Sequence, residues 1–352
     1  MASVGTRRQR GQAGAIARLA VRSLYVELCL YPKPGLVSLI DSGSHGDMDA
    51  ATFMRSLFAL RHYFRDICLA GMHGAPFAQL KQLGIAAEAR MMGASRGVNT
   101  HRGAIFSLGL LCAAAGRIHA RALPLSAATL RSVMLQHWGA ALAAHSNGAV
   151  PANRAVAAKA VNDGDDGDGD DDDGGDGGND GGDGDAGDND DDGGGDNRNA
   201  GGNGDGDHGN AGGDAGQAGH GQRAAALHAA SGAREEGALG LPSVFEVGLP
   251  ALRATLARGG SIYHARIDAL FALMGHVSDT NVLHRGGVEG ARLVRDEARR
   301  FVVLGGTAHA GWRERAMACH HRLVRHRLSP GGAADLLAAT CLVHAMAARG
   351  RA

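Results

Sequence analysis

The chain has 352 residues, 44% of them hydrophobic, and 36 basic side chains balance 36 acidic ones. This neutral total is the sum of two oppositely charged parts of the chain. Residues 162–221 contain 20 Asp, one Arg and no Glu, so that segment carries −19 and the rest of the chain +19. The five cysteines are widely spaced and lack a Cys-x-x-Cys pair, which argues against a disulfide scaffold and a structural zinc site. A reducing compartment, the cytoplasm, fits best.

The first elements along the chain read as helices. The first 26 residues hold five Arg and no acidic residue, as a targeting segment would. Apolar residues nevertheless recur at helical spacing from Ile16, which favours a first helix behind a frayed basic end. Asp47 or Asp49 can cap a helix whose apolar side chains follow at i, i+4, i+7 and i+11 from Phe53.

A central helix is expected after Asn99, which can cap it together with Thr100. Its body at 104–115 is apolar on all sides, is interrupted by polar or small residues, and is too short to cross a bilayer. Strand-like alternation hardly appears, so we expect an all-α bundle in one domain and no membrane association. Further helices are expected at residues 127–144, 247–257, 266–277, 289–303, 311–327 and 333–348.

The acidic tract at 162–221 is a different kind of segment. Asp/Gly repeats can form calcium-binding β-rolls, but this tract contains no Val, Ile, Leu, Met or aromatic residue to fill a roll. Without apolar surface to offset chain entropy, we expect it to be a disordered insertion. Residues 1–161 and 222–352 are then the N-terminal and C-terminal parts of one catalytic domain.

A polar cluster at residues 41–49 is the densest in the chain. Asp41, Asp47 and Asp49 accompany His45 in a loop that leads into a helix. Carboxylates of this kind suit Mg²⁺, which proteins usually hold together with substrate phosphates. A helix cap explains Asp47 or Asp49, but it does not explain Asp41 and His45.

Cationic side chains occupy two further positions of interest. Arg102 falls in the first turn of a helix, against the dipole preference, and a bound phosphate would give the reason; an ordinary cap among glycines is the equal alternative. Lys33 stands between two prolines and is either a fixed phosphate cation or a solvated lysine.

Two more clusters follow the acidic tract. Glu235 and Glu236 are paired on an expected loop, where glutamates are usually solvated. Asp279, Asn281 and Arg285 come at the end of an apolar helix and look like a site loop. The chain lacks the P-loop, the dinucleotide-binding glycine pattern, the nucleophile elbow and the His-Glu-x-x-His pattern, which removes the common nucleotide folds, α/β-hydrolases and zincins.

Taken together, the motifs resemble triphosphoribosyl-dephospho-CoA synthases, most closely the malonate decarboxylase branch. They cover roughly residues 18–348 apart from the tract. They are Lys33-Pro-Gly-Leu-Val-Ser38 with residues 41–49, Gly97-Val-Asn-Thr-His-Arg-Gly-Ala-Ile-Phe106, Gly232-Ala-Arg-Glu-Glu236 with Pro242-Ser-Val-Phe-Glu-Val-Gly-Leu-Pro250, Asp279-Thr-Asn-Val-Leu-His-Arg-Gly-Gly287 and Ser329-Pro-Gly-Gly-Ala-Ala-Asp335.

The resemblance implies an all-α, Mg²⁺-dependent transferase. It would join ATP and 3'-dephospho-CoA into 2'-(5''-triphosphoribosyl)-3'-dephospho-CoA and release adenine. The product is the precursor of the prosthetic group of an acyl-carrier subunit of malonate decarboxylase. A phosphoribosyl-dephospho-CoA transferase would receive it and act on that subunit.

On this hypothesis each polar residue has a role, assigned by its chemistry. The expected Mg²⁺ ligands are Asp41, Asp47 and Asp279. The expected ATP-binding groups are Lys33, Arg102, Arg285, Asn99 and Asn281. The base and the stabiliser of the cationic sugar are sought in Glu235 and Glu236. The proton donor to adenine is sought in His45 and His101.

Two other classes of function remain open. A hydrolase or kinase that uses the same metal loop on ATP is the nearer one. A basic helical nucleic-acid-binding protein is the more distant one, because it has no need of three carboxylates in one loop and aromatic residues for stacking are scarce. The +19 body suits two polyanionic substrates, so we expect no nucleic-acid partner.

Overall fold

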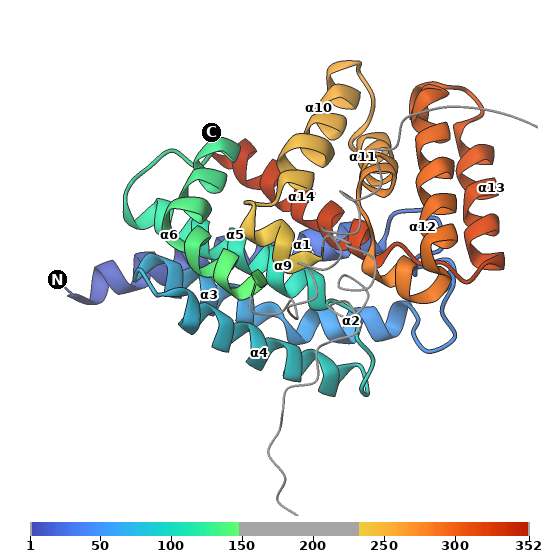
Figure 1. Ribbon diagram of the computed structural model, residues 1–352. Coiled ribbons are helices and arrows are strands. Elements are labelled where there is room, and N and C mark those ends of the chain that lie inside the picture. The colour runs from blue at the N-terminus through green and yellow to red at the C-terminus, as the bar shows by residue number, and fades with distance from the viewer. Residues whose placement is uncertain (1, 148–231, 351–352) are drawn as a thin grey trace, which may run out of the picture. The chain divides into compact units, whose positions relative to one another are not determined.

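The protein is described by a computed structural model that covers residues 2–147 and 232–350 (Figure 1). Within these residues the chain forms helices and turns without a strand, so the predicted all-α class is confirmed. Before the gap lie α1 (Ala2–Leu28), α2 (Ala50–Ala59), α3 (Arg61–Met72), α4 (Phe77–Ala94), α5 (Arg102–Ala120) and α6 (Ala127–Asn147). After it lie α9 (Ala233–Ala238), the π-helical η1 (Ser243–Gly248), α10 (Leu249–Ala257), α11 (Ile262–His276), α12 (Thr280–Val303), the 3₁₀ turn η2 (Gly306–Ala308), α13 (Trp312–Arg325) and α14 (Gly331–Arg349).

Most expected helices are present, with four differences. The helix capped by Asp49 is divided at Leu60 into α2 and α3. The sequence did not indicate α4, because its fully buried residues form only a narrow stripe. Helix α12 begins well before the predicted residue 289 and passes through Gly287, whose positive φ of 59° kinks it. The pair Glu235 and Glu236 lies in the short helix α9 and not on a loop.

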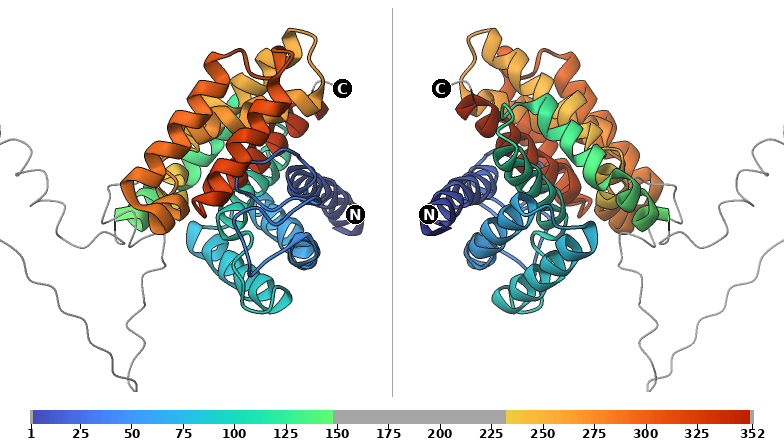
Figure 2. Two further views of the ribbon diagram at one scale, coloured as in Figure 1. Left: turned by 90° about the vertical axis from the view of Figure 1, so that its right-hand side faces the viewer. Right: turned by 90° about the vertical axis from the view of Figure 1, so that its left-hand side faces the viewer.

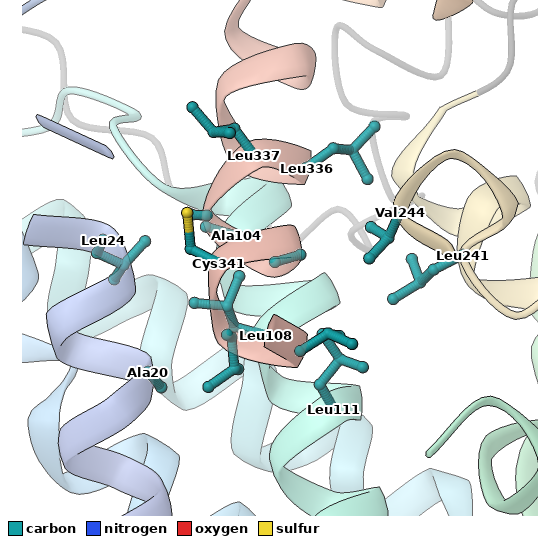
Figure 3. Close-up of a cluster of buried hydrophobic side chains, with 14 of the residues drawn as sticks. Ala20, Leu24, Ala104, Leu108, Leu111, Leu241, Val244, Leu336, Leu337 and Cys341 are labelled. Atoms are coloured by element: carbon teal, nitrogen blue, oxygen red, sulfur yellow. The ribbon is translucent and has the colours of Figure 1, made fainter. Parts of the chain in front are cut away.

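The core is built on two apolar helices, α5 and α14, which pack against each other. Helix α5 also contacts α1, α3 and α6, and α14 also contacts α1, α10 and α11. In Figures 1 and 2 the blue to teal helices α1–α4 and the orange helices α10–α13 lie on different sides of the bundle. Figure 3 shows Leu24 of α1, Leu108 of α5 and Cys341 of α14 among the buried side chains of this core. Segments from both sides of the gap therefore share one core.

Helices α5 and α14 are also long and apolar enough to cross a membrane by length and composition alone. Most of each helix is buried against other helices of the bundle. Core helices pass the same test of length and composition. Because α5 and α14 are mostly buried, both are core helices of this bundle. The expected disordered insertion at 162–221 lies outside the described residues.

Helices α3 and α5 cross closely because glycines remove side chains at the contact. A Cβ atom at Gly71 would lie 2.0 Å from the carbonyl oxygen of Ala113, and one at Gly116 would lie 2.0 Å from that of Cys68. Both obstacles are backbone atoms, which cannot rotate away. This crossing fixes the position of α5, whose first turn contributes to the candidate site.

We predict that Gly71→Ala lowers the free energy of unfolding by at least about 2 kcal/mol, because the methyl group overpacks the crossing. Gly84→Ala in α4 is the control, since its methyl would meet only Tyr63 Oη at 3.9 Å. There the better helix propensity of Ala should raise stability by about 0.5–1 kcal/mol. Urea unfolding followed by circular dichroism measures both, and equal stability of the two variants would contradict the close crossing.

Candidate functional site

One buried carboxylate joins the starts of two helices. Asp279 is the N-cap of α12, and its Oδ1 accepts a hydrogen bond from the backbone N–H of Asn281 at 2.9 Å. Its Oδ2 accepts from the backbone N–H of Ala333, in the first turn of α14, at 3.1 Å. A Cβ at Gly332 would lie 2.9 Å from the same Oδ2, so the glycine permits this approach. Asp279 thus caps α12 and α14 together.

A second carboxylate connects α14 to the start of α5. Asp335 accepts a hydrogen bond from the backbone N–H of Ala104, in the first turn of α5. Gly103 makes room for it, because a Cβ there would lie 2.3 Å from Asp335 Oδ2. The first turns of α5, α12 and α14 are therefore brought together by two acidic side chains. Backbone N–H groups at helix starts favour anions, so this junction is suited to negative charge.

A buried ion pair lies beside this junction. Lys33 is 1% exposed, and its Nζ is 2.5 Å from Oε1 of Glu27 at the end of α1. The alternative of a solvated Lys33 is therefore wrong. Burial raises the pKa of Glu27, and Lys33 opposes that shift. The Lys33 carbonyl oxygen lies 3.2 Å from Nδ1 of the buried His320, so the turn that carries Lys33 is held on both sides.

The side chains at and beside this junction include more acidic than basic groups. Burial raises the pKa of Asp335 well above its ordinary value, and the nearby carboxylates of Glu27 and Asp279 raise it further. The N–H of Ala104 and the charge of Lys33 act in the opposite direction. Burial also raises the pKa of Asp279, against the hydrogen bonds from backbone N–H groups. Asp335 is thus the group in this cluster most inclined to hold a proton.

Sequence reasoning gave no role to Glu27 or Asp335. Glu27 lies inside a helix, six residues before Lys33, and nothing in its local pattern marks it. Asp335 is the last residue of the fifth motif, and its place in that motif is the sequence signal that could have identified it.

The loop at 41–49 is fixed by short-range contacts. Asp41 Oδ1 accepts from the backbone N–H of Gly43 at 2.9 Å, and its Oδ2 lies 3.6 Å from His320 Nε2. Asp49 caps α2 by accepting from the N–H and the hydroxyl of Thr52, both at 2.7 Å. Asp47 is 60% exposed, and its carboxylate lies 3.5 Å from the ring of His45. Of the two expected caps, Asp49 is the one that the structure uses.

His45 and Arg285 connect this loop to the start of α14. Arg285 donates to the carbonyl oxygen of Ser44 at 3.0 Å and lies 3.1 Å from His45 Nδ1. His45 Nε2 lies 2.7 Å from the hydroxyl oxygen of Ser329. Burial and then the charge of Arg285 lower the pKa of His45, while Asp47 raises it. The neutral ring therefore accepts from Arg285 at Nδ1 and donates from Nε2 to Ser329.

His101 is buried at the start of α5. Its Nδ1 lies 2.6 Å from the hydroxyl oxygen of Ser56 and 3.1 Å from that of Thr100. Burial, and then the charge of Lys33, lower the pKa of His101 to about 3. The ring is neutral at physiological pH, so any contribution to catalysis is as a hydrogen-bond donor and not as an imidazolium acid. Its Nε2 is buried without a hydrogen-bond partner in the described part of the chain.

A second polar area lies where α4, α5 and α9 meet. Arg102 forms a partly exposed ion pair with Glu88 of α4, and its backbone N–H donates to Asn99 Oδ1 at 3.2 Å. Arg234 of α9 lies close enough for Glu88 to raise its pKa and for Arg102 to lower it, although burial is the larger effect and lowers it. This Arg was part of a recognised motif, but it received no role from the sequence.

The two glutamates of α9 differ in their surroundings. Glu236 is buried and accepts from the hydroxyl of Ser243 at 2.6 Å and from its backbone N–H at 3.2 Å. Burial raises the pKa of Glu236, and these hydrogen bonds oppose the shift. Glu235 is half-buried. Glu236 therefore attaches α9 to η1, which leaves Glu235 the more accessible carboxylate.

The expected Mg²⁺ ligands do not form one ready-made centre. No group of three His, Cys, Asp or Glu side chains in residues 2–147 and 232–350 is arranged to hold a metal ion. Asp279 already accepts backbone N–H groups with both oxygens, and Asp41 accepts one at Oδ1.

The comparison with known proteins agrees with these motifs. The sequence profile of the ATP:dephospho-CoA triphosphoribosyl transferase family matches residues 13–167 and 199–352. The chain belongs to this family. It is accordingly an enzyme of the transferase class.

Individual relatives cover nearly the whole chain. A protein of Acinetobacter calcoaceticus named "Probable 2-(5''-triphosphoribosyl)-3'-dephosphocoenzyme-A synthase" is 33% identical over 92% of this chain and 87% of its own length. A Pectobacterium atrosepticum protein named 2-(5''-triphosphoribosyl)-3'-dephosphocoenzyme-A synthase is 32% identical over 96% of this chain and 91% of its own length. No solved structure matches the chain significantly.

We predict that Asp279→Ala lowers the free energy of unfolding by about 2 kcal/mol or more, since one helix cap contributes about 0.5–2 kcal/mol and Asp279 caps two helices. Asp49→Ala removes the single cap of α2 and is the control. Urea unfolding of both variants measures the difference. A loss for Asp279→Ala no greater than that for Asp49→Ala would contradict the double cap.

The raised pKa of Asp335 predicts a pH effect on stability. The folded protein binds this proton more tightly than the unfolded chain, so the stabilisation is full below the unfolded pKa of about 3.9 and is lost as pH rises through the folded pKa. Asn keeps an acceptor for Ala104 and carries no charge. Asp335→Asn should therefore be more stable than the natural protein at pH 8, by about 1–3 kcal/mol, with the difference fading toward pH 4.

Asp66→Asn, in an exposed pair with Arg65, is the control for this experiment and should show no such gain. Thermal and urea unfolding across the pH range measure both variants. A stability difference for Asp335→Asn that does not change with pH would show that Asp335 has an ordinary pKa.

Proposed function

We propose that the chain makes 2'-(5''-triphosphoribosyl)-3'-dephospho-CoA from ATP and 3'-dephospho-CoA and releases adenine. The names of the relatives from Acinetobacter calcoaceticus and Pectobacterium atrosepticum support this activity. The observation that carries it within the molecule is the junction of the first turns of α5, α12 and α14, where residues of three motifs meet. We further propose that the product serves the acyl-carrier subunit of malonate decarboxylase through a phosphoribosyl-dephospho-CoA transferase, and that the enzyme works in the cytoplasm.

In the proposed reaction, the 2'-hydroxyl of dephospho-CoA attacks C1' of the ATP ribose. The new C–O bond forms as the bond from C1' to adenine breaks. A base takes the hydroxyl proton, and the departing adenine takes up a proton, so that it leaves as the neutral base. The ribose passes through an oxocarbenium-like state that a carboxylate stabilises. Glu235 is the stronger candidate for the base, because the oxygens of Glu236 are engaged by Ser243.

The triphosphate needs accessible cations. Arg285 is exposed, and its side chain contacts two carbonyl oxygens and a neutral imidazole, so its charge is available to phosphate. Arg102 is compensated by Glu88 and must exchange that partner for phosphate. Lys33 is buried and paired with Glu27, so we propose that it acts through the field at the junction and not by direct contact.

Mg²⁺ enters this proposal as part of the substrate MgATP. It would neutralise phosphate charge, and Asp47 is an exposed carboxylate of the 41–49 loop that, unlike Asp49, caps no helix and can approach it. Asn281, at the start of α12, lies beside Gly331 of α14, and we propose that its side-chain amide binds a substrate group there.

Product analysis tests the function. The purified chain is incubated with MgATP and dephospho-CoA, and the mixture is separated by chromatography. We expect free adenine that depends on dephospho-CoA, with a coupled product of the summed mass less adenine. Formation of ADP would indicate a kinase, and adenine without dephospho-CoA would indicate a hydrolase; either result would overturn the proposal.

We predict that Glu235→Gln lowers kcat at least about 100-fold with little change in KM, as expected for a base acting in the transition state. Glu236→Ala should lower stability because it removes the acceptor of both Ser243 hydrogen bonds, and Ser243→Ala should reproduce part of that loss because it removes one of them. Steady-state kinetics and thermal unfolding separate the two roles. If Glu235→Gln retains kcat, the base is another group.

A further inference from the structure

A second concave site lies between α1, α10, α11 and α14. It encloses about 200 Å³, and its ten lining residues include none of the candidate site residues. Helix α14 packs against α1 on one side and against α10 and α11 on the other, so it forms the floor between them. The two halves of α14 therefore lie in different surroundings. Its first turn is part of the junction with α5 and α12, and its second half lines this pocket.

The polar side of the pocket is cationic. Arg22 of α1 and Arg266 of α11 line it, and none of the ten lining residues is Asp or Glu. Neither arginine takes part in an ion pair within the described ranges. Arg266 lies against the thiol of Cys341, and its Nε is buried without a hydrogen-bond partner in the described part of the protein. A buried N–H without an acceptor is costly, and an oxygen of a ligand would supply one.

The pocket also has an apolar part. Leu19 and Val26 of α1, Leu252 of α10 and Ile262 of α11 line it together with the two arginines. Ile262 is 39% exposed, so part of its side chain is open to solvent. The volume is below the range of about 300–1,000 Å³ that is typical of sites for drug-sized ligands. The pocket is therefore too small for a nucleotide and large enough for a short molecule.

We propose that this pocket binds a small organic anion with a short apolar chain. The guanidinium groups of Arg22 and Arg266 hold its anionic group, and the aliphatic side chains cover its chain. Arginine suits both carboxylate and phosphate because its N–H groups pair with two oxygens at once. The site does not rest on the proposed function, since no residue of the catalytic junction takes part in it.

The full chain is titrated with butyrate that carries a trifluoromethyl label, and binding is followed by fluorine NMR. We expect saturable broadening of the fluorine signal. The neutral amide of the same acid should not bind, because it lacks the charge. Unlabelled butyrate and butyl phosphate are then used as competitors, and the stronger competitor identifies the anionic group as carboxylate or phosphate.

Matched variants locate the site. Arg22→Gln and Arg266→Gln should each weaken binding at least about tenfold, which corresponds to about 1.4 kcal/mol. Arg18→Gln on α1 and Arg253→Gln on α10 change arginines of the same helices, or of a neighbouring one, that do not line the pocket, and both should bind like the natural protein. Arg22 is exposed, so its variant keeps the test valid even if Arg266→Gln fails to fold.

Three results would overturn the proposal. They are an absence of saturable binding to the natural protein, equal loss of binding in the control variants, and competition by inorganic phosphate as strong as that by butyl phosphate. Displacement of the probe by dephospho-CoA would show that the pocket belongs to the substrate site, which also contradicts a separate site.

Discussion

The arrangement of this bundle depends on buried carboxylates that accept backbone N–H groups at helix starts. Each helix leaves its first N–H groups without partners, and burial makes that costly. Asp279 supplies acceptors to α12 and α14 at once, and Asp335 supplies one to α5. Because these bonds join different helices, they fix the relative positions of the first turns as well as the stability of each.

The same interaction creates an electrostatic conflict. The junction collects Glu27, Asp279 and Asp335 out of water, and Lys33 is the cation that is buried with them. Buried like charges raise one another's pKa, and one of them is then held protonated. A protein selected for stability alone would gain by replacing such a group. A buried carboxylate with a raised pKa among the motif residues is typical of a functional site, where activity is retained at the expense of stability.

The sequence predicts local features of this fold well and distant pairings poorly. The cap of α2, expected at Asp47 or Asp49, and the apolar character of α5 follow from neighbouring residues, and both were predicted. The hydrogen bond from Ala104 to Asp335 joins residues more than 200 positions apart, so no local pattern contains it. Glu236 was assigned to a loop because its partner, Ser243, becomes visible only when α9 and η1 are folded. The five motifs indicated that these regions matter, but they did not give the partners.

The charge distribution explains why cations differ in their suitability for phosphate. Two obstacles can keep a cationic side chain from a substrate phosphate. If it is already paired, it loses the attraction of its partner on binding the phosphate. If it is buried, it cannot reach the phosphate without moving. Lys33 meets both obstacles. Arg102 meets the first, although its pair with Glu88 is partly exposed and therefore weak. Arg285 meets neither, because it is exposed and is held by neutral acceptors that orient its guanidinium without cancelling the charge. The physical ranking of the three expected phosphate cations is therefore Arg285, then Arg102, then Lys33, an order that their sequence motifs alone did not distinguish.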